Sequence, residues 1–364
     1  MTPELGSIRK PHQRYSRLRG MCVAAALGAL LSVPFTAKSA FAETLQFATM
    51  FPESDFSSEM VKRWTDGVTE RTDGRIQFRV HWGGSLVPSA GLLDGLRDGT
   101  IDAALQFSSY VSGEIIDLAV LEVPFSWPQS RDGSLAFHQE VTPIVDDIYS
   151  QYGSRVVSAP PVLLPNPLTC TDRFLSGPDK WSGALVRTAG RWQGAAIERM
   201  GGSPVVMGFG DVYSALERGT INCTLAVYNF LYSVKLYEPA KYVTRLDHSI
   251  AFGSINVSNI TWDRLSEEDQ KIMREVGDEV MIWGHDEFLR RYEETLDLLA
   301  AEGVKFCTPD DSEFARLIDV ADSLIADELT GNVSADGTRL LEVVERFRPQ
   351  VTARPEVGDV TSCP

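Results

Sequence analysis

The stretch LVRTAGRWQGAAIERMGGSPVVMGFGDVYSALERGTINCTL, residues 185–225, decides the fold. It opens with a strand-like segment that ends at Arg187 and continues into a helix whose apolar residues have helical spacing. After a glycine pair, a second strand leads into a helix that begins at Asp211 and ends at Gly219. A third strand closes the stretch. This alternation of strands and helices predicts an α/β fold.

Arg187 is the residue of this stretch that points to a function. A guanidinium at a strand end lies beside the free N–H groups and the positive dipole of the following helix, and this combination suits a carboxylate. We therefore predict that Arg187 holds the carboxylate of a ligand. A structural salt bridge to one of the many acidic residues is the alternative.

A second segment of the chain repeats part of this stretch. LRDGTIDAAL at 96–105 and LERGTINCTL at 216–225 share Leu, Gly-Thr-Ile, an Asx residue and a closing Leu in the same register. Each predicts a helix, a glycine cap and a strand. The repeat suggests two related α/β lobes, with a ligand cleft beyond the carboxyl ends of their strands. A chance match of so short a segment is the alternative.

The rest of the chain continues the same alternation. We expect further strands at 44–48, 75–80, 100–107, 155–164, 241–246, 252–259 and 304–306, and helices at 57–71, 89–97, 134–152 and 229–236. This pattern is typical of mostly parallel sheets. A long helix begins after a Ser-x-x-Asp cap at Ser266 and runs toward Glu302, far enough to span both lobes. Pro165 and Pro167 mark a stiff crossover between the lobes.

The length of 364 residues suits two domains preceded by an export signal. A basic start, an apolar run over 21–35 and the Ala-Phe-Ala at 40–42 predict a cleaved signal peptide, residues 1–42, with cleavage after Ala42. An uncleaved anchor is the alternative. No later segment is apolar and long enough to cross a bilayer, so we expect no stable membrane insertion.

The charge and the cysteine content are typical of an exported protein. Without the signal, 28 Lys and Arg face 49 Asp and Glu, a net charge of −21, which argues against nucleic acid or an anionic membrane as partner. Cys170, Cys223, Cys307 and Cys363 are an even number of cysteines for an oxidising compartment. Of the three possible pairings we expect 170 with 223 and 307 with 363. Buried free thiols are the alternative.

Signatures of catalysis, cofactors and metals are missing from the sequence. It has no Gly-x-Ser-x-Gly turn, dinucleotide loop or Walker loop, and its five histidines lack ligand spacing. Glu114, Glu122 and Asp211 are candidates for acid–base chemistry, but a solvated or helix-capping role is the better interpretation. We therefore expect a protein that is not an enzyme and that needs no cofactor or metal.

Taken together, these motifs resemble the DctP-like family, the periplasmic solute-binding proteins of tripartite ATP-independent periplasmic (TRAP) transporters. The most specific matches are GALVR at 183–187, GSPV at 202–205, DVYSAL at 211–216 with Gly219, GTID at 99–102 and VPF at 123–125. The resemblance covers essentially the whole chain after the signal.

The resemblance implies a two-lobed periplasmic binding protein fold with hinge strands and a long helix across both lobes. The first lobe would comprise 43–164 with about 252–291 returning to it, and the second 165–251 with about 292–364. Such a protein closes over an organic acid in the periplasm and passes it to a TRAP membrane permease. An exported enzyme using the same cleft, or a binding protein for an ABC importer or a sensor kinase, is the alternative.

The resemblance also implies which residues bind the ligand. The carboxylate-binding arginine of the family falls on Arg187. Further pocket positions fall on Met50, Phe107, Tyr110, Phe209 and Ala226, with Arg191 as an additional candidate. The alternative is that Phe209 and Tyr110 belong to the hydrophobic core and do not contact a ligand.

The chain departs from its relatives in ways that bear on the substrate. Some relatives carry a second arginine where this chain has Pro167, and a polar pair where it has Leu225 and Ala226. One guanidinium in an apolar pocket suits a monocarboxylate with an apolar or aromatic body, because a second buried carboxylate would lack a partner. A C4-dicarboxylate or other organic acid held through Arg173 or Arg191 is the alternative.

Overall fold

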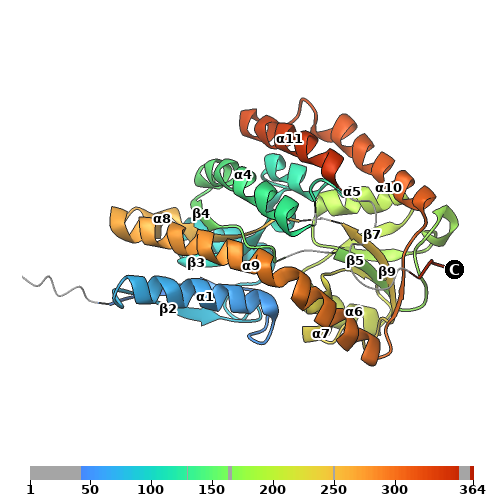
Figure 1. Ribbon diagram of the computed structural model, residues 1–364, viewed down its shortest axis with the longest axis horizontal. Helices are drawn as coiled ribbons and strands as arrows, with labels where there is room; N and C mark the ends of the chain where they lie inside the picture. The colour runs from blue at the N-terminus through green and yellow to red at the C-terminus, as the bar shows by residue number, and fades with distance from the viewer. Residues whose placement is uncertain (1–41, 129, 163–165, 249–250, 352–360) are drawn as a thin grey trace, which may run out of the picture. The chain divides into compact units, whose positions relative to one another are not determined.

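Two β-sheets flanked by helices form the framework of the protein (Figure 1). The structure is a computed structural model that describes residues 42–128, 130–162, 166–248, 251–351 and 361–364. Residues 1–41 of the predicted signal peptide lie outside the described residues, so cleavage after Ala42 stays a prediction. Across the described part of the chain, no helix has the length and apolar character needed to cross a membrane.

The first sheet has five strands in the order β2-β1-β3-β10-β4. They are β1 (Glu43–Ala48), β2 (Ile76–His81), β3 (Ala103–Phe107), β4 (Ser154–Ser158) and β10 (Gly253–Ser258). Its helices are α1 (Phe56–Arg71), α2 (Leu92–Asp98), α3 (Ser108–Val111), α4 (Arg131–Ser150) and α8 (Asn259–Trp262), with the short segments η1 (Ser89–Gly91) and η2 (Ile116–Glu122). Phe47, Leu105 and Ile255 are fully buried, so helices cover the apolar side chains of neighbouring strands.

The second sheet has six strands in the order β11-β9-β5-β8-β6-β7. They are β5 (Asn166–Cys170), β6 (Leu185–Thr188), β7 (Ser203–Val206), β8 (Cys223–Leu225), β9 (Tyr242–His248) and β11 (Lys305–Cys307). The helices between them are α5 (Arg191–Met200), α6 (Val212–Glu217) and α7 (Tyr228–Ser233), with the short segments η3 (Pro178–Lys180) and η4 (Phe209–Asp211). The stretch 185–225 supplies three of these strands, as predicted.

Each sheet contains one strand that runs against its neighbours. β10 is antiparallel to β3 and β4, and β5 is antiparallel to β8 and β9. The other described neighbouring pairs are parallel. β5 follows directly after β4 of the first sheet, and β10 follows directly after β9 of the second, so the chain enters each of these strands straight from a strand of the other sheet. The prediction of mostly parallel sheets is confirmed, with these two crossing strands as the exceptions.

The repeated segments 96–105 and 216–225 fold in the same way. Gly99 and Gly219 both end a helix with positive φ, at 76° and 72°, the conformation that glycine adopts without strain. The Asx residue three positions after each glycine makes an equivalent hydrogen bond in both sheets. Asp102 accepts a hydrogen bond from the backbone of β1 at 2.7 Å, and Asn222 accepts one from the backbone of β6 at 2.7 Å.

Helix α9 (Glu267–Ala301) runs along both sheets, as Figure 1 shows, and the prediction of a long spanning helix is confirmed. Ser266 caps it by accepting a hydrogen bond from the backbone N–H of Asp269 at 3.1 Å. Its first half packs against α1, α4 and β4. Further along, Tyr292 packs on Tyr228 of α7 and accepts a hydrogen bond from Arg245 of β9 at 2.7 Å.

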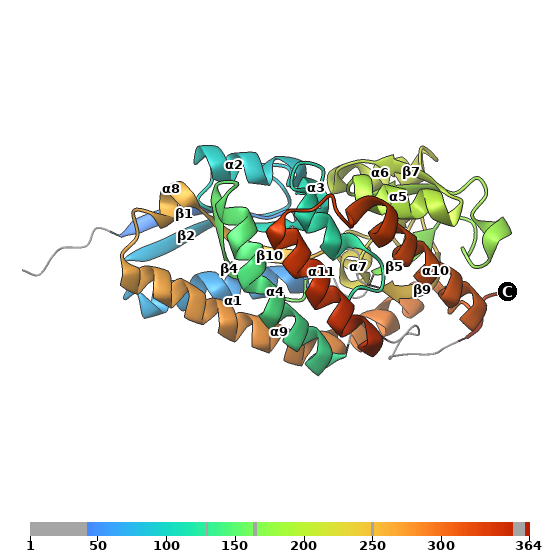
Figure 2. The same cartoon turned by 90° about the horizontal axis from the view of Figure 1, so that it is seen from above.

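The C-terminal helices were not predicted from the sequence. They are α10 (Asp311–Leu324) and α11 (Ala335–Phe347), with the short segments η5 (Ile325–Leu329) and η6 (Arg348–Gln350). The predicted division assigned 292–364 to the second lobe, yet α11 packs against α4 and η2 beside the first sheet (Figure 2). Phe347 of α11 meets the ring of Phe137 edge-on at 5.5 Å, so apolar contact draws this helix to the first lobe.

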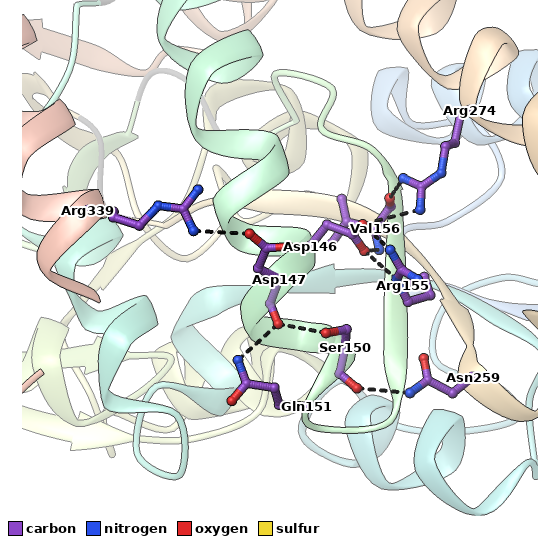
Figure 3. Close-up of polar contacts among 9 residues, drawn as sticks. All are labelled: Asp146, Asp147, Ser150, Gln151, Arg155, Val156, Asn259, Arg274 and Arg339. Atoms are coloured by element: carbon purple, nitrogen blue, oxygen red, sulfur yellow. Dashed lines mark hydrogen bonds and ion pairs between the residues drawn. The ribbon is translucent and has the colours of Figure 1, made fainter. Parts of the chain in front are cut away.

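Charged contacts at the end of α4 reinforce this arrangement (Figure 3). Arg339 of α11 donates to Asp147 at 3.0 Å. The neighbouring Asp146 accepts hydrogen bonds from both the side chain of Arg155 and the backbone of Val156, and Arg274 of α9 lies 3.2 Å away. Burial alone would raise the pKa of Asp146, but these partners hold it below its usual value. The carboxylate thus joins α4, β4 and α9.

Two disulfides join Cys170 to Cys223 and Cys307 to Cys363, so the expected pairing is confirmed. Cys170 and Cys223 lie directly opposite each other on the antiparallel strands β5 and β8. The predicted crossover falls partly outside the described residues, since Pro165 is among those not described. Pro167 belongs to β5.

Gly277 marks the closest approach of α9 to the first sheet. A Cβ at this position would lie 1.8 Å from the carbonyl oxygen of Val157, so Gly277→Ala must push the helix away from β4. We expect a loss of about 3 kcal/mol in the free energy of unfolding, at the upper end for overpacked cores, in urea denaturation. Gly113→Ala is the control, because no atom lies within 4 Å of its added Cβ. Equal stability of the two variants would contradict this account.

Candidate functional site

A cavity opens where the carboxyl ends of the parallel strands of both sheets meet. The space around it, open solvent included, is about 380 Å³. The lining residues lie at or beyond the carboxyl ends of β1, β3, β6, β7 and β8, or next to the amino ends of the crossing strands β5 and β10. They are Met50, Phe107, Ser109, Tyr110, Asn166, Arg187, Ala189, Gln193, Phe209, Leu225, Ala226, Val227, Phe230 and Ala251. This is the edge of an α/β sheet at which ligands bind.

Arg187 lies at the base of this cavity and is only 3 % exposed. Its Nε and Nη2 donate to the carbonyl oxygen of Met207 at 3.1 and 3.0 Å. Nη2 also donates to the hydroxyl of Tyr110, from the first lobe, at 3.0 Å. Neutral acceptors therefore fix the guanidinium plane.

The charge of Arg187 has no acidic partner in the described part of the chain. No Asp or Glu oxygen described there lies within 4.0 Å of its guanidinium, whereas most other described arginines form such pairs. The ring of Phe209 lies beneath it at 4.7 Å and stacks on Phe230 at 4.1 Å. A cation–π contact compensates only part of the cost of burying a charge, so an added anion would be stabilised here.

The residues predicted for the site fall into two groups. Met50, Phe107, Tyr110, Phe209 and Ala226 line the cavity together with Arg187.

Arg191 and Arg173 do not line the cavity. Arg191 is the first residue of α5, its side chain is 70 % exposed, and it lies 3.9 Å from Glu328. Arg173 lies in a surface loop, where it pairs with Asp172 at 3.0 Å. The position of Arg191 therefore gives no support to its predicted ligand contact.

Three polar lining residues were missed from the sequence. They are Ser109, Asn166 and Gln193. The side-chain oxygen of Gln193 accepts the backbone N–H of Ala189 at 2.8 Å, so it occupies one of the donors near the start of α5. A Gln at the third position of a helix is a recognised capping signal that could have identified it. Ser109 and Asn166 carry no such signal.

The loops of the two lobes touch beside the cavity. A Cβ at Gly190 would lie 2.0 Å from the carbonyl oxygen of Ser109, so only glycine allows this approach. The indole N–H of Trp192 donates to the carbonyl oxygen of Ser112 at 3.1 Å. Together with the bond from Arg187 to Tyr110, these contacts connect α3 to β6 and α5.

Glu122 corrects one sequence interpretation, because it is buried rather than solvated. It is 1 % exposed, and among the described residues neither of its carboxylate oxygens accepts a hydrogen bond of good geometry. Glu122 lines a second cavity. Gln193 and Leu225 line both this cavity and the one at Arg187. Burial raises the pKa of Glu122 to about 8, against an opposing effect of the nearby Ser112 hydroxyl. Glu114, by contrast, is exposed and pairs with Arg97 at 2.6 Å.

The raised pKa of Glu122 gives a pH-dependent stability. The folded chain keeps a proton that the unfolded chain releases above pH 4.5, so stability falls by about 1.4 kcal/mol per pH unit up to about pH 8. Gln has no such proton, and Glu122→Gln should therefore gain melting temperature relative to the wild type between pH 5 and 8. Glu114→Gln is the exposed control. A constant difference between Glu122→Gln and wild type across this range would refute the raised pKa.

Comparisons with known proteins agree with this architecture. The family model DctP, described as bacterial extracellular solute-binding protein, family 7, matches residues 47–330. A solute-binding protein of Chromohalobacter salexigens is 28% identical over 270 residues, which cover 71% of this chain and 77% of that protein. The 2,3-diketo-L-gulonate-binding periplasmic protein YiaO of Escherichia coli is 26% identical over 255 residues, covering 66% and 73%.

Solved structures share the fold. A TRAP periplasmic solute-binding protein of a Sulfitobacter species with bound β-D-galacturonate has a TM-score of 0.75 at 20% identity, covering 84% of this chain and 100% of that one. DctP7 of Bordetella pertussis, an extracytoplasmic solute receptor binding pyroglutamic acid, has a TM-score of 0.75 at 17% identity with the same coverage. The two-lobed periplasmic binding protein fold is thereby confirmed.

Proposed function

The chain belongs to the DctP family, family 7 of the bacterial extracellular solute-binding proteins, and we propose that it captures an organic acid by its carboxylate. The family is one of binding proteins rather than enzymes. In this proposal Arg187 binds the carboxylate in the periplasm. The protein with its bound acid then delivers that acid to a TRAP membrane permease.

The observation that carries the proposal is that Arg187 is buried and that no described acidic side chain pairs with it. A cation that is 3 % exposed and held by neutral acceptors favours an anion in the adjoining cavity. Because Tyr110 and Arg187 come from different lobes, an anion bound between them interacts best with the closed arrangement. Closure would then follow from the difference in affinity between the open and closed states.

The lining favours a monocarboxylate with an apolar or aromatic body. Met50, Phe107, Phe209 and Phe230 are among the lining residues, and apolar side chains outnumber polar ones there. A sugar acid is the second candidate, because Ser109, Asn166 and Gln193 are able to bind hydroxyl groups and because the Sulfitobacter relative holds galacturonate.

A dicarboxylate is less well supported. Its second carboxylate would need Arg173 or Arg191, and neither lines the cavity. A buried carboxylate without a partner costs several kcal/mol, so a dicarboxylate would bind more weakly than a matched monocarboxylate.

Arg187→Ala tests the central contact. We expect it to abolish acid binding in isothermal titration calorimetry while the far-ultraviolet circular dichroism spectrum stays native. Arg191→Ala is the matched control and should keep wild-type affinity, because Arg191 is exposed outside the cavity. Unchanged affinity of Arg187→Ala would remove this residue from the site.

A panel of acids tests the substrate class. Phenylacetate, glucuronate and succinate represent the aromatic monocarboxylates, the sugar acids and the dicarboxylates. A bound acid at 100 times its dissociation constant should stabilise the protein by about 2.7 kcal/mol, which a thermal shift detects. We expect the largest shift from phenylacetate. The largest shift from glucuronate would favour the second candidate, and one from succinate would refute the single-carboxylate proposal.

A further inference from the structure

We propose that the ligand is an elongated monocarboxylate whose apolar or aromatic tail leaves the Arg187 cavity and occupies a neighbouring groove. This inference rests on the proposed function and adds to it a second subsite and a preference for length. The space at the groove, open solvent included, is about 1030 Å³, against about 380 Å³ for the space at the Arg187 cavity measured in the same way.

The groove and the cavity share a wall. Met50, Phe209 and Phe230 line both spaces. Phe209 is the ring beneath the Arg187 guanidinium, and Phe230 stacks on it at 4.1 Å. A ligand whose carboxylate meets Arg187 would reach the groove by extending past these rings. Their faces favour an aryl or alkyl group.

Glycines keep the groove open on both sides. Gly83 and Gly84 follow β2 of the first sheet, and Gly208 and Gly210 follow β7 of the second. A Cβ added at Gly83, Gly208 or Gly210 would meet no atom within 4 Å. The space beside these three positions is therefore free to receive a ligand.

The chemistry of the groove excludes a second anionic group. Pro52, Pro88, Val234 and Leu236 contribute apolar surface. Asp211 is the one ionisable carboxylate in the described lining, and no described Lys, Arg or His lines the groove. A second carboxylate would thus face a like charge without compensation, whereas an apolar tail gains by leaving water.

A chain-length series tests the second subsite. Phenylacetate, 3-phenylpropionate, 4-phenylbutyrate and 6-phenylhexanoate are titrated into the wild-type protein by calorimetry. We expect the dissociation constant to fall about fourfold for each methylene that enters the groove. Equal or weaker binding of the longer acids overturns the inference while the proposed function stands. Failure of every acid, including those of the earlier panel, overturns both.

Gly208→Leu tests where the tail lies. Gly208 has φ of −61°, so a side chain there causes no backbone strain, and leucine should fill the groove. We expect at least a tenfold loss of affinity for 6-phenylhexanoate and less than a twofold change for phenylacetate. Gly113→Leu, which also meets open space but does not line the groove, should change neither. Equal loss for both acids, or no loss for the long one, overturns the inference.

Discussion

The buried guanidinium of Arg187 is the interaction on which the site depends. Most described arginines of this acid-rich protein pair with a carboxylate, but Arg187 is held by the carbonyl oxygen of Met207 and the hydroxyl of Tyr110. Such neutral acceptors orient the cation without neutralising it. If an external anion binds beside it as proposed, that anion would offset the free-energy cost of burying the charge, and binding would stabilise the folded protein.

The topology of the two sheets brings the required groups to one edge. Parallel strands present their carboxyl ends there, and the crossing strands β5 and β10, which run the other way, present their amino ends. Asn166 and Ala251 consequently lie in the same cavity as Tyr110 and Arg187, although they are far apart in the sequence. The chain therefore crosses between the two sheets beside the cavity that we propose to bind the ligand.

Local sequence patterns predicted the elements with strong periodicity or capping signals. The repeat at 96–105 and 216–225, the cap at Ser266 and the strand-end Arg187 all belong to this class. Helices α10 and α11 were missed, and the assignment of 292–364 to one lobe failed to anticipate that α11 packs on α4, because side-chain contacts between distant segments decide that placement. The burial of Glu122 was missed for the same reason. A glutamate in an acidic protein is usually solvated, and only the packing of η2 against the core removes it from water.

The position of β10 also constrains the order in which the protein can fold. In the first sheet, β4 pairs with β10 and with no other described strand, and β10 lies almost one hundred residues later in the chain. During synthesis, residues 43–158 therefore emerge without the strand that joins β4 to β3. The amino-terminal half cannot complete its sheet as an autonomous unit. The chain must return from the second sheet first, which makes the acquisition of native structure in the two halves mutually dependent.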